Sequence, residues 1–154
     1  MIIYYLDASA WVKRHQSEAG SAWMGHLWRP ERSFSCAGLG LVEVCCAVAR
    51  RHAAAGLPPS HTQAMLQVIS RDYESFVQIE MDPRLLSLAQ SLAVRRRLRG
   101  ADCMHLAAAM RLREVWEGSV ALVASDAELL AAAVAEGFAV LDPSDDPPLP
   151  AEPG

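Results

Sequence analysis

Four acidic residues stand where a carboxylate is costly for folding and useful for holding a metal ion: Asp7, Glu43, Asp102 and Asp126. Each of them follows, interrupts or opens a run of apolar or small residues. A charge that is buried without a partner is strongly unfavourable. Because this placement recurs through the chain, it suggests one shared counter-charge, and a divalent cation is the simplest candidate. Carboxylate oxygens are ligands that Mg²⁺ or Mn²⁺ prefers.

The elements that position these acids follow from the hydrophobic pattern. Short apolar runs predict strands at residues 2–6, 33–36, 76–81, 120–124 and 138–141. Helical patterns lie between them, after residue 7 and over 20–28, 39–55, 60–73, 82–97, 102–115 and 126–136. Strands that alternate with helices predict an α/β fold of three layers, in which a central, mainly parallel sheet is flanked by helices on both faces.

Each acid also has a structural explanation that the sequence alone leaves open. Asp7 can cap the helix that follows it, and Asp102 can cap a helix that begins after Gly100. The stretch 125–128 fits a capping box in which Ser125 is the cap and Glu128 reaches back, which would give Asp126 a structural role. Glu43 could belong to a solvated stripe of a helix that is only half covered. Asp7 and Asp126 nevertheless both follow predicted strands, and ligands collect at that edge of a parallel sheet.

Length and composition bound the class of protein. The 154 residues, of which 52% are hydrophobic and 21% charged, predict one globular domain over 1–143. A Pro-rich tail over 144–154 has too little apolar surface to pack and is expected to be flexible. No apolar run is long enough to cross a membrane, and the first residues do not resemble a signal peptide. The four cysteines lack CxxC spacing, so we expect reduced thiols and a cytoplasmic location.

Basic residues cluster close in sequence to the acids, although the net charge is −4. Arg95, Arg96, Arg97 and Arg99 precede Asp102 and are candidates for contacts with the phosphates of a nucleic acid. The alternative is that such residues complement the dipole at the end of a helix. If they bind RNA, reversing their charge should weaken binding and flatten its dependence on salt.

Four sequence blocks occur in order and at compatible spacing: residues 6–10, 41–44 with Arg50 beyond them, 98–109, and 124–129 followed by 136–143. Together they resemble the PIN-domain ribonucleases, and among them the VapC-like toxins of toxin–antitoxin pairs, over nearly the whole chain from Tyr5 to Pro143. One departure is Ala124, because the family often has a threonine two residues before its last aspartate.

The resemblance implies a metal-dependent endoribonuclease that leaves a 5′-phosphate and a 3′-hydroxyl. In that family role, Asp7, Glu43 and Asp102 would hold Mg²⁺ or Mn²⁺, and Asp126 would complete the site. Hydroxyl groups expected beside these ligands are those of Ser9 and Ser125. The resemblance also implies two protein partners, a small cognate antitoxin and a second copy of the chain in a homodimer.

Other functions fit the residues less well. A phosphohydrolase of the haloacid-dehalogenase kind needs a second aspartate two residues after the first, where this chain has Ser9. A nucleotide-binding module would show a glycine-rich phosphate loop, and none is present. A non-catalytic, protein-binding domain of the same fold would be expected to lose its acids. His105 shares a helical face with Asp102, but we expect a packed or capping residue there and not a ligand.

Overall fold

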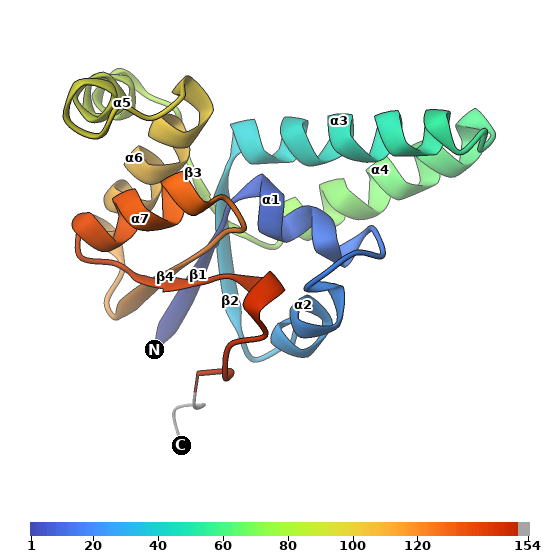
Figure 1. The fold of residues 1–154 in the computed structure, drawn as a ribbon, viewed down its shortest axis with the longest axis horizontal. Helices are drawn as coiled ribbons and strands as arrows, with labels where there is room; N and C mark the ends of the chain where they lie inside the picture. Colours follow the sequence, from blue (N-terminus) through green and yellow to red (C-terminus); the bar gives the residue numbers. More distant parts are fainter. Residues whose placement is uncertain (151–154) are drawn as a thin grey trace.

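The computed structural model describes residues 1–150, in which a five-stranded sheet lies between two layers of helices (Figure 1). The strands are β1 (Ile2–Leu6), β2 (Ser33–Ala37), β3 (Val77–Ile79), β4 (Ser119–Val123) and β5 (Ala139–Leu141). Their order is β3-β2-β1-β4-β5, and every neighbouring pair is parallel. The prediction of a three-layer α/β fold with a mainly parallel sheet is therefore confirmed.

The central strand β1 is buried on both faces. Successive side chains of a strand point to opposite sides, so Ile3 and Tyr5 join one hydrophobic cluster, whereas Tyr4 and Leu6 join the other. All four are almost inaccessible to solvent. This two-sided burial explains why the strand is a continuous apolar run and why it ends where a charged residue, Asp7, begins.

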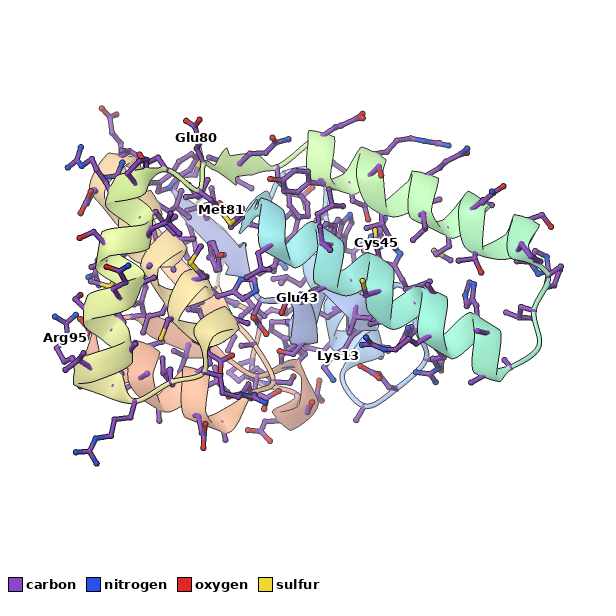
Figure 2. The ribbon with its side chains drawn as sticks, turned by 90° about the horizontal axis from the view of Figure 1, so that it is seen from above. Lys13, Glu43, Cys45, Glu80, Met81 and Arg95 are labelled. Atoms are coloured by element: carbon purple, nitrogen blue, oxygen red, sulfur yellow. The ribbon has the colours of Figure 1, made fainter. Side chains whose placement is uncertain are left out.

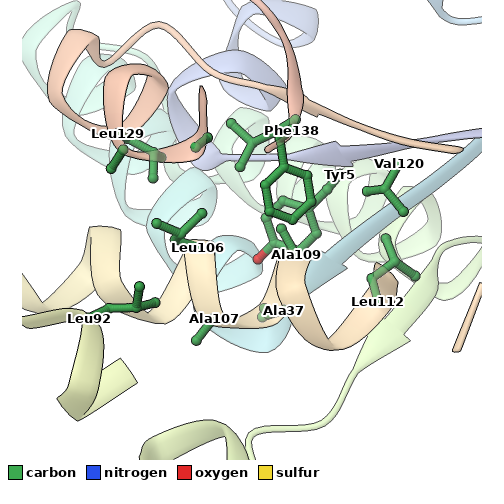
Figure 3. Packing of buried hydrophobic residues seen from close by; sticks show 14 of the residues in the cluster. Tyr5, Ala37, Leu92, Leu106, Ala107, Ala109, Leu112, Val120, Leu129 and Phe138 are labelled. Atoms are coloured by element: carbon green, nitrogen blue, oxygen red, sulfur yellow. The ribbon is translucent and has the colours of Figure 1, made fainter. Parts of the chain in front are cut away.

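The first helical layer consists of α5 (Pro83–Arg96), α6 (Gly100–Val115) and α7 (Ala127–Ala135). In Figure 3, Leu106 and Leu112 of α6 lie with Tyr5, Val120 and Phe138 in one cluster. Full burial of a leucine contributes roughly 1.5–3 kcal/mol. The small residues of α6 let this helix approach the sheet closely.

The second layer covers the opposite face with α1 (Ala8–Trp11), the 3₁₀ turn η1 (Val12–Arg14), α2 (Ser21–Leu27), α3 (Gly38–Ala54) and α4 (Pro59–Glu74). Figure 1 shows α3 and α4 side by side, as an antiparallel pair that extends beyond the sheet. Aromatic rings fill the space beneath them, with the Trp11 and Phe76 centroids 5.0 Å apart. Within residues 1–150, no helix is both long enough and apolar enough to cross a bilayer.

Three predicted helix starts differ from the structure. Helix α4 begins at Pro59, one residue before its predicted start at residue 60; proline suits the first helical position because its missing N–H would have no partner there anyway. Helix α6 begins at Gly100, so Asp102 lies in its first turn and is not the cap. The cap of α7 is Asp126 itself, not Ser125, because Oδ1 of Asp126 accepts the Leu129 amide over 2.9 Å.

The Pro-rich C-terminal segment makes contacts that its composition did not predict. The turn η2 (Pro143–Asp145) leads to Pro147, whose carbonyl accepts a hydrogen bond of 2.6 Å from the Trp23 indole. Leu149 packs against the cluster that contains Trp23. The expectation of too little apolar surface to pack is therefore wrong up to residue 150, and residues 151–154 lie outside the described part of the chain. The boundary at residue 143 stays a prediction.

Candidate active site

The order of the strands creates a crevice at the carboxyl edge of the sheet. From β1 the chain first builds β2 and β3 on one side, and it then returns to build β4 and β5 on the other side. The loops that leave β1 and β4 consequently diverge, and such a switch point is where open α/β sheets bind ligands. Asp7 directly follows β1, and Asp126 lies three residues beyond β4.

All four predicted acids line one pocket of about 300 Å³ at this edge. The pocket is lined by Asp7, Ala8, Ser9, Glu43, Arg99, Ala101, Asp102 and Asp126. The acids come from four separate segments, namely the β1–α1 junction, α3, α6 and the start of α7. Figure 2 shows Glu43 near the middle of the molecule, between α3 and α6. The sequence prediction that these acids would meet is confirmed; their chemical role stays a prediction.

Asp7 is held by both of its oxygens. Its Oδ2 accepts the Ser9 amide over 3.0 Å and also accepts the Ser9 hydroxyl, so Asp7 is the predicted cap of α1. Its Oδ1 lies 3.3 Å from Nε2 of His105. The side chain is therefore both a helix cap and a wall of the pocket, because each carboxylate oxygen has more than one acceptor site.

Two serines connect this site to its surroundings, but in different ways. The Ser9 hydroxyl accepts a hydrogen bond of 2.9 Å from the Ser125 amide, which joins the end of β1 to the loop after β4. The Ser125 hydroxyl instead donates to Oδ1 of Asp142 over 2.7 Å. Ser9 lies beside the acids as expected. Ser125 contributes its backbone, and its side chain makes a different contact from the one that the sequence suggested.

Asp102 and Asp126 share Arg99. The Arg99 Nε lies 3.4 Å from Oδ2 of Asp102, and its Nη2 lies 3.0 Å from Oδ2 of Asp126. Burial raises the pKa of Asp102, the charges of Asp126 and Asp7 raise it further, and Arg99 opposes the shift. An ionised Asp102 thus costs folding free energy that a nearby cation offsets.

His105 is buried, as expected for a packed residue, but it also contacts the other two acids, which the sequence did not predict. Its Nε2 lies 2.6 Å from Oε2 of Glu43 and 3.3 Å from Oδ1 of Asp7. Burial lowers the pKa of His105, but the hydrogen bond to Glu43 and the charges of Asp7, Glu43 and Asp102 outweigh it and raise the pKa. The available signal was its position three residues after Asp102, on the same face of the helix.

The predicted arginine group is divided between two places. Arg95 and Arg96 both contact Oε1 of Glu136, over 3.1 and 2.7 Å, and Figure 2 shows Arg95 at the outer side of α5, away from Glu43. Burial raises the pKa of Glu136, but its hydrogen bond to Arg96 and the charges of both arginines lower it overall. Arg97 ends α5 in the left-handed region and is exposed. Of the four, Arg99 alone lines the pocket.

The four acids that line the pocket suit a hard divalent cation, because such ions prefer carboxylate oxygens as ligands. As the side chains stand, no group of three or more histidine, cysteine or acidic residues within 1–150 surrounds a single ion position. The acids instead contact other side chains in pairs. Arg99 contacts both Asp102 and Asp126, and Nε2 of His105 contacts both Asp7 and Glu43. A metal ion at Asp102 and Asp126 therefore requires Arg99 to move, and its side chain is 73% exposed.

Comparison with solved structures supports the fold. VapBC-1 from nontypeable Haemophilus influenzae has a TM-score of 0.60 at 10% identity, covering 92% of this chain and 98% of that one. A toxin-antitoxin complex from Klebsiella pneumoniae has a TM-score of 0.59 at 16% identity, covering 91% and 97%. VapBC2 from Rickettsia felis, bound to a DNA fragment from its promoter, has a TM-score of 0.61 at 11% identity, covering 91% and 98%. At these identities the likeness concerns the fold alone.

Comparison with curated sequences identifies the family, although no family model matches the chain. Ribonuclease VapC45 of Mycobacterium tuberculosis (strain CDC 1551 / Oshkosh) is 34% identical over 114 residues, covering 71% of this chain and 76% of the relative. Ribonuclease VapC49 of Mycobacterium tuberculosis (strain ATCC 25618 / H37Rv) gives the same identity and the same coverage. The chain therefore belongs to the VapC ribonuclease family.

Proposed function

We propose that this chain is a metal-dependent endoribonuclease and the toxin of a toxin–antitoxin pair. The observation that supports this most directly is the convergence of Asp7, Glu43, Asp102 and Asp126 in one pocket at the carboxyl edge of the sheet. The relatives that are 34% identical to this chain over 114 residues are named ribonucleases. An acidic pocket facing a polyanionic substrate requires a cation to bridge the two, since carboxylates and phosphates repel each other.

Mg²⁺ or Mn²⁺ would be held by Asp7, Glu43 and Asp102, with Asp126 completing the site or holding a second ion. Such an ion, when bound, polarises the phosphodiester and lowers the pKa of a coordinated water. Burial, and then the charges of Asp126 and Asp7, raise the pKa of Asp102, and a cation bound at this carboxylate would offset both effects. Arg99 has little packing to lose when it leaves, since most of its side chain is exposed.

RNA contacts are proposed for Arg99 and Arg97 and not for the whole arginine group. Arg99 borders the pocket, and Arg97 is exposed two residues before it. Arginine binds phosphate oxygens well because its planar donors fit them in pairs. Arg95 and Arg96 are committed to Glu136, so their contribution to RNA binding is expected to be small.

The test is cleavage of RNA by purified protein in Mg²⁺ or Mn²⁺, with EDTA as the metal-free comparison. Asp102→Asn should abolish metal-dependent cleavage while the protein stays folded, because the amide removes the charge and keeps the shape. Glu114→Gln is the matched control, since Glu114 is an exposed carboxylate on the same helix. Full cleavage by folded Asp102→Asn protein would contradict the proposed role.

The same assays separate the other candidate functions. Hydrolysis of a small phosphate ester without cleavage of RNA would favour a phosphohydrolase. Metal binding with neither activity would favour a non-catalytic protein-binding domain.

The proposal extends to partners and location. An antitoxin is expected to be encoded beside this chain; co-expression should restore growth of cells that the chain inhibits, and the two proteins should co-purify. A homodimer is expected in light scattering after gel filtration. We place the protein in the cytoplasm, where RNA is available and where Cys36, Cys45, Cys46 and Cys103, all free thiols in the structure, would remain reduced.

A further inference from the structure

His105 is the most completely enclosed polar group at the acidic pocket. Its side chain is 1% exposed, yet its two ring nitrogens have partners on three other residues of the chain. Nε2 lies 2.6 Å from Oε2 of Glu43 and 3.3 Å from Oδ1 of Asp7, and Nδ1 lies 3.0 Å from the Tyr5 hydroxyl. A ring placed only to fill the core would not have carboxylates on one side and a phenol on the other.

The chemistry of the partners fixes which way the ring donates. Ionised carboxylates only accept hydrogen bonds, so the proton shared with Glu43 and Asp7 belongs to Nε2. On the other side, the hydroxyl of the fully buried Tyr5 lies 3.0 Å from Nδ1, and a hydroxyl can both donate and accept a hydrogen bond. The Tyr5 hydroxyl can be either the donor or the acceptor of the hydrogen bond with Nδ1. The rings of Tyr5 and His105 meet edge-on, with their centroids 6.0 Å apart.

The neighbouring helix is shaped to admit this ring. Gly40 lies one turn before Glu43 on α3. A Cβ atom at Gly40 would lie 3.2 Å from Cε1 of His105 and 2.3 Å from Sγ of Cys36. Because a side chain at this position would displace the ring, glycine lets α3 approach α6 closely enough for Glu43 to reach His105.

From these contacts we infer that His105 is a positioning residue that holds Glu43 and Asp7 in the orientation needed to bind the cation. This inference rests on the proposed function, because it deepens the description of the same metal site. Glu43 is attached through three rotatable bonds, and its side chain is 33% exposed. A charge-assisted hydrogen bond to a buried ring restricts it, and a cation then meets oxygens that are already placed. His105 itself contacts neither the cation nor RNA.

The experiment compares Mn²⁺ affinity, measured by calorimetry or by electron paramagnetic resonance, in wild type, His105→Leu and His105→Gln. Loss of the partner that orients a metal ligand typically weakens metal binding by about 10- to 100-fold, and we expect that range for His105→Leu. Glutamine ends in an amide N–H at a similar reach, so His105→Gln should recover most of the affinity. A role in packing alone would not distinguish these variants in this way.

Tyr5→Phe provides a second comparison, in case His105→Leu does not fold. It removes only the hydroxyl that steadies the ring, and Mn²⁺ binding should weaken by a smaller factor. Wild-type affinity in folded His105→Leu, an equal loss in His105→Gln, or wild-type affinity in Tyr5→Phe would each overturn the inference. RNA cleavage by the wild type is measured on the same preparation. A wild type that binds Mn²⁺ but leaves RNA intact contradicts the proposed nuclease, and the affinities still decide the role of His105.

Discussion

Nη2 of Arg99 lies 3.0 Å from Oδ2 of Asp126, and the same guanidinium also reaches Asp102. The two carboxylates thus share a positive charge supplied by the chain itself. Asp102 contributes most to the raised pKa of Arg99, which stays protonated. Because the arginine side chain is 73% exposed, it can leave these oxygens with little loss of packing. A divalent cation bound as proposed would therefore compete with Arg99 for the carboxylates of Asp102 and Asp126.

Replacing Arg99 with glutamine should change metal binding and RNA binding in opposite directions. Loss of the competing charge should tighten Mn²⁺ binding by about two- to five-fold, the modest effect expected for an exposed ion pair. The same variant should bind RNA more weakly, with the slope of log K against log salt reduced by about 1. Calorimetric Mn²⁺ titrations and RNA binding at several salt concentrations measure the two effects.

Arg97→Gln is the control for the Mn²⁺ titration, because it removes an equal charge two residues away without touching the pocket. It should leave Mn²⁺ affinity unchanged. An equal gain in affinity in both variants would show that only the general electrostatic field had changed, and competition for the carboxylates would be ruled out.

Asp126 combines a structural contact with a proposed ligand role, and one substitution separates them. Asparagine caps helices about as well as aspartate. The free energy of unfolding of Asp126→Asn should therefore lie within about 0.5 kcal/mol of the wild-type value, while its RNA cleavage falls. Asp126→Ala should lose cleavage and also about 1 kcal/mol of stability, because Oδ1 no longer accepts the Leu129 amide. Urea unfolding and cleavage assays on both variants provide the comparison. Wild-type cleavage by Asp126→Asn would mean that Asp126 caps helix α7 but is not a metal ligand.

The positions of the site residues that directly follow strands could be predicted from the sequence, because the direction of parallel strands decides at which edge of the sheet they lie. Asp7 and Asp126 follow strands whose apolar runs are continuous, and parallel strands end at a common edge. The contact between Glu43 and His105 was not predictable, because it joins helices on opposite faces of the sheet and depends on the small volume of Gly40. The sequence around Glu43 or His105 does not indicate how closely α3 and α6 approach each other.

The arginines show the same limit in a different form. They lie within five residues of one another, and composition alone treats them as one group. The backbone leaves α5 at Arg97, with φ of 56°, and this turn directs Arg99 to the pocket while Arg95 and Arg96 remain beside Glu136. One residue in a left-handed conformation therefore decides which arginine faces the acids.

The close approach at Gly40 predicts a marked cost for an added methyl group. Gly40→Ala should lower the free energy of unfolding by about 1–3 kcal/mol, the usual range for overpacking, because the new Cβ would overlap Cys36 and press on His105. Removing the sulfur in the double variant Gly40→Ala with Cys36→Ala should recover part of this loss. Chemical denaturation of the single and double variants measures both effects.

Gly25→Ala is a matched control for this prediction, since Gly25 lies inside α2 and a Cβ there would meet no atom within 4 Å. Alanine should stabilise that helix by up to about 1 kcal/mol. A stabilising effect at Gly40 as well would contradict the tight packing of α3 against His105.

Asp72 predicts how stability depends on pH. Its Oδ2 lies 3.0 Å from Nε of Arg14 and 3.2 Å from Nε2 of His15, which ties α4 to the segment that follows α1. Burial raises the pKa of Asp72, but the close contact with His15 and the hydrogen bond from Arg14 outweigh it and lower the pKa below its ordinary value. A carboxyl with a lowered folded pKa stabilises the protein above the unfolded pKa of about 3.9, and this contribution is lost as pH falls through the folded pKa.

Asp72→Asn should therefore be less stable than wild type at pH about 7, by about 1–2 kcal/mol. This is lower than the roughly 1.5–3 kcal/mol of a hydrogen bond to a charged group, because solvent screens the partly exposed Arg14. The difference should shrink as pH falls below about 4, because the wild-type carboxyl then also becomes neutral. Urea unfolding of both proteins, down to the lowest pH at which they are still folded without urea, measures this difference in stability. Glu74→Gln is the control, because Glu74 is an exposed carboxylate on the same helix. A difference that stays constant over the whole pH range would mean that shape, and not the charge of Asp72, holds α4 in place.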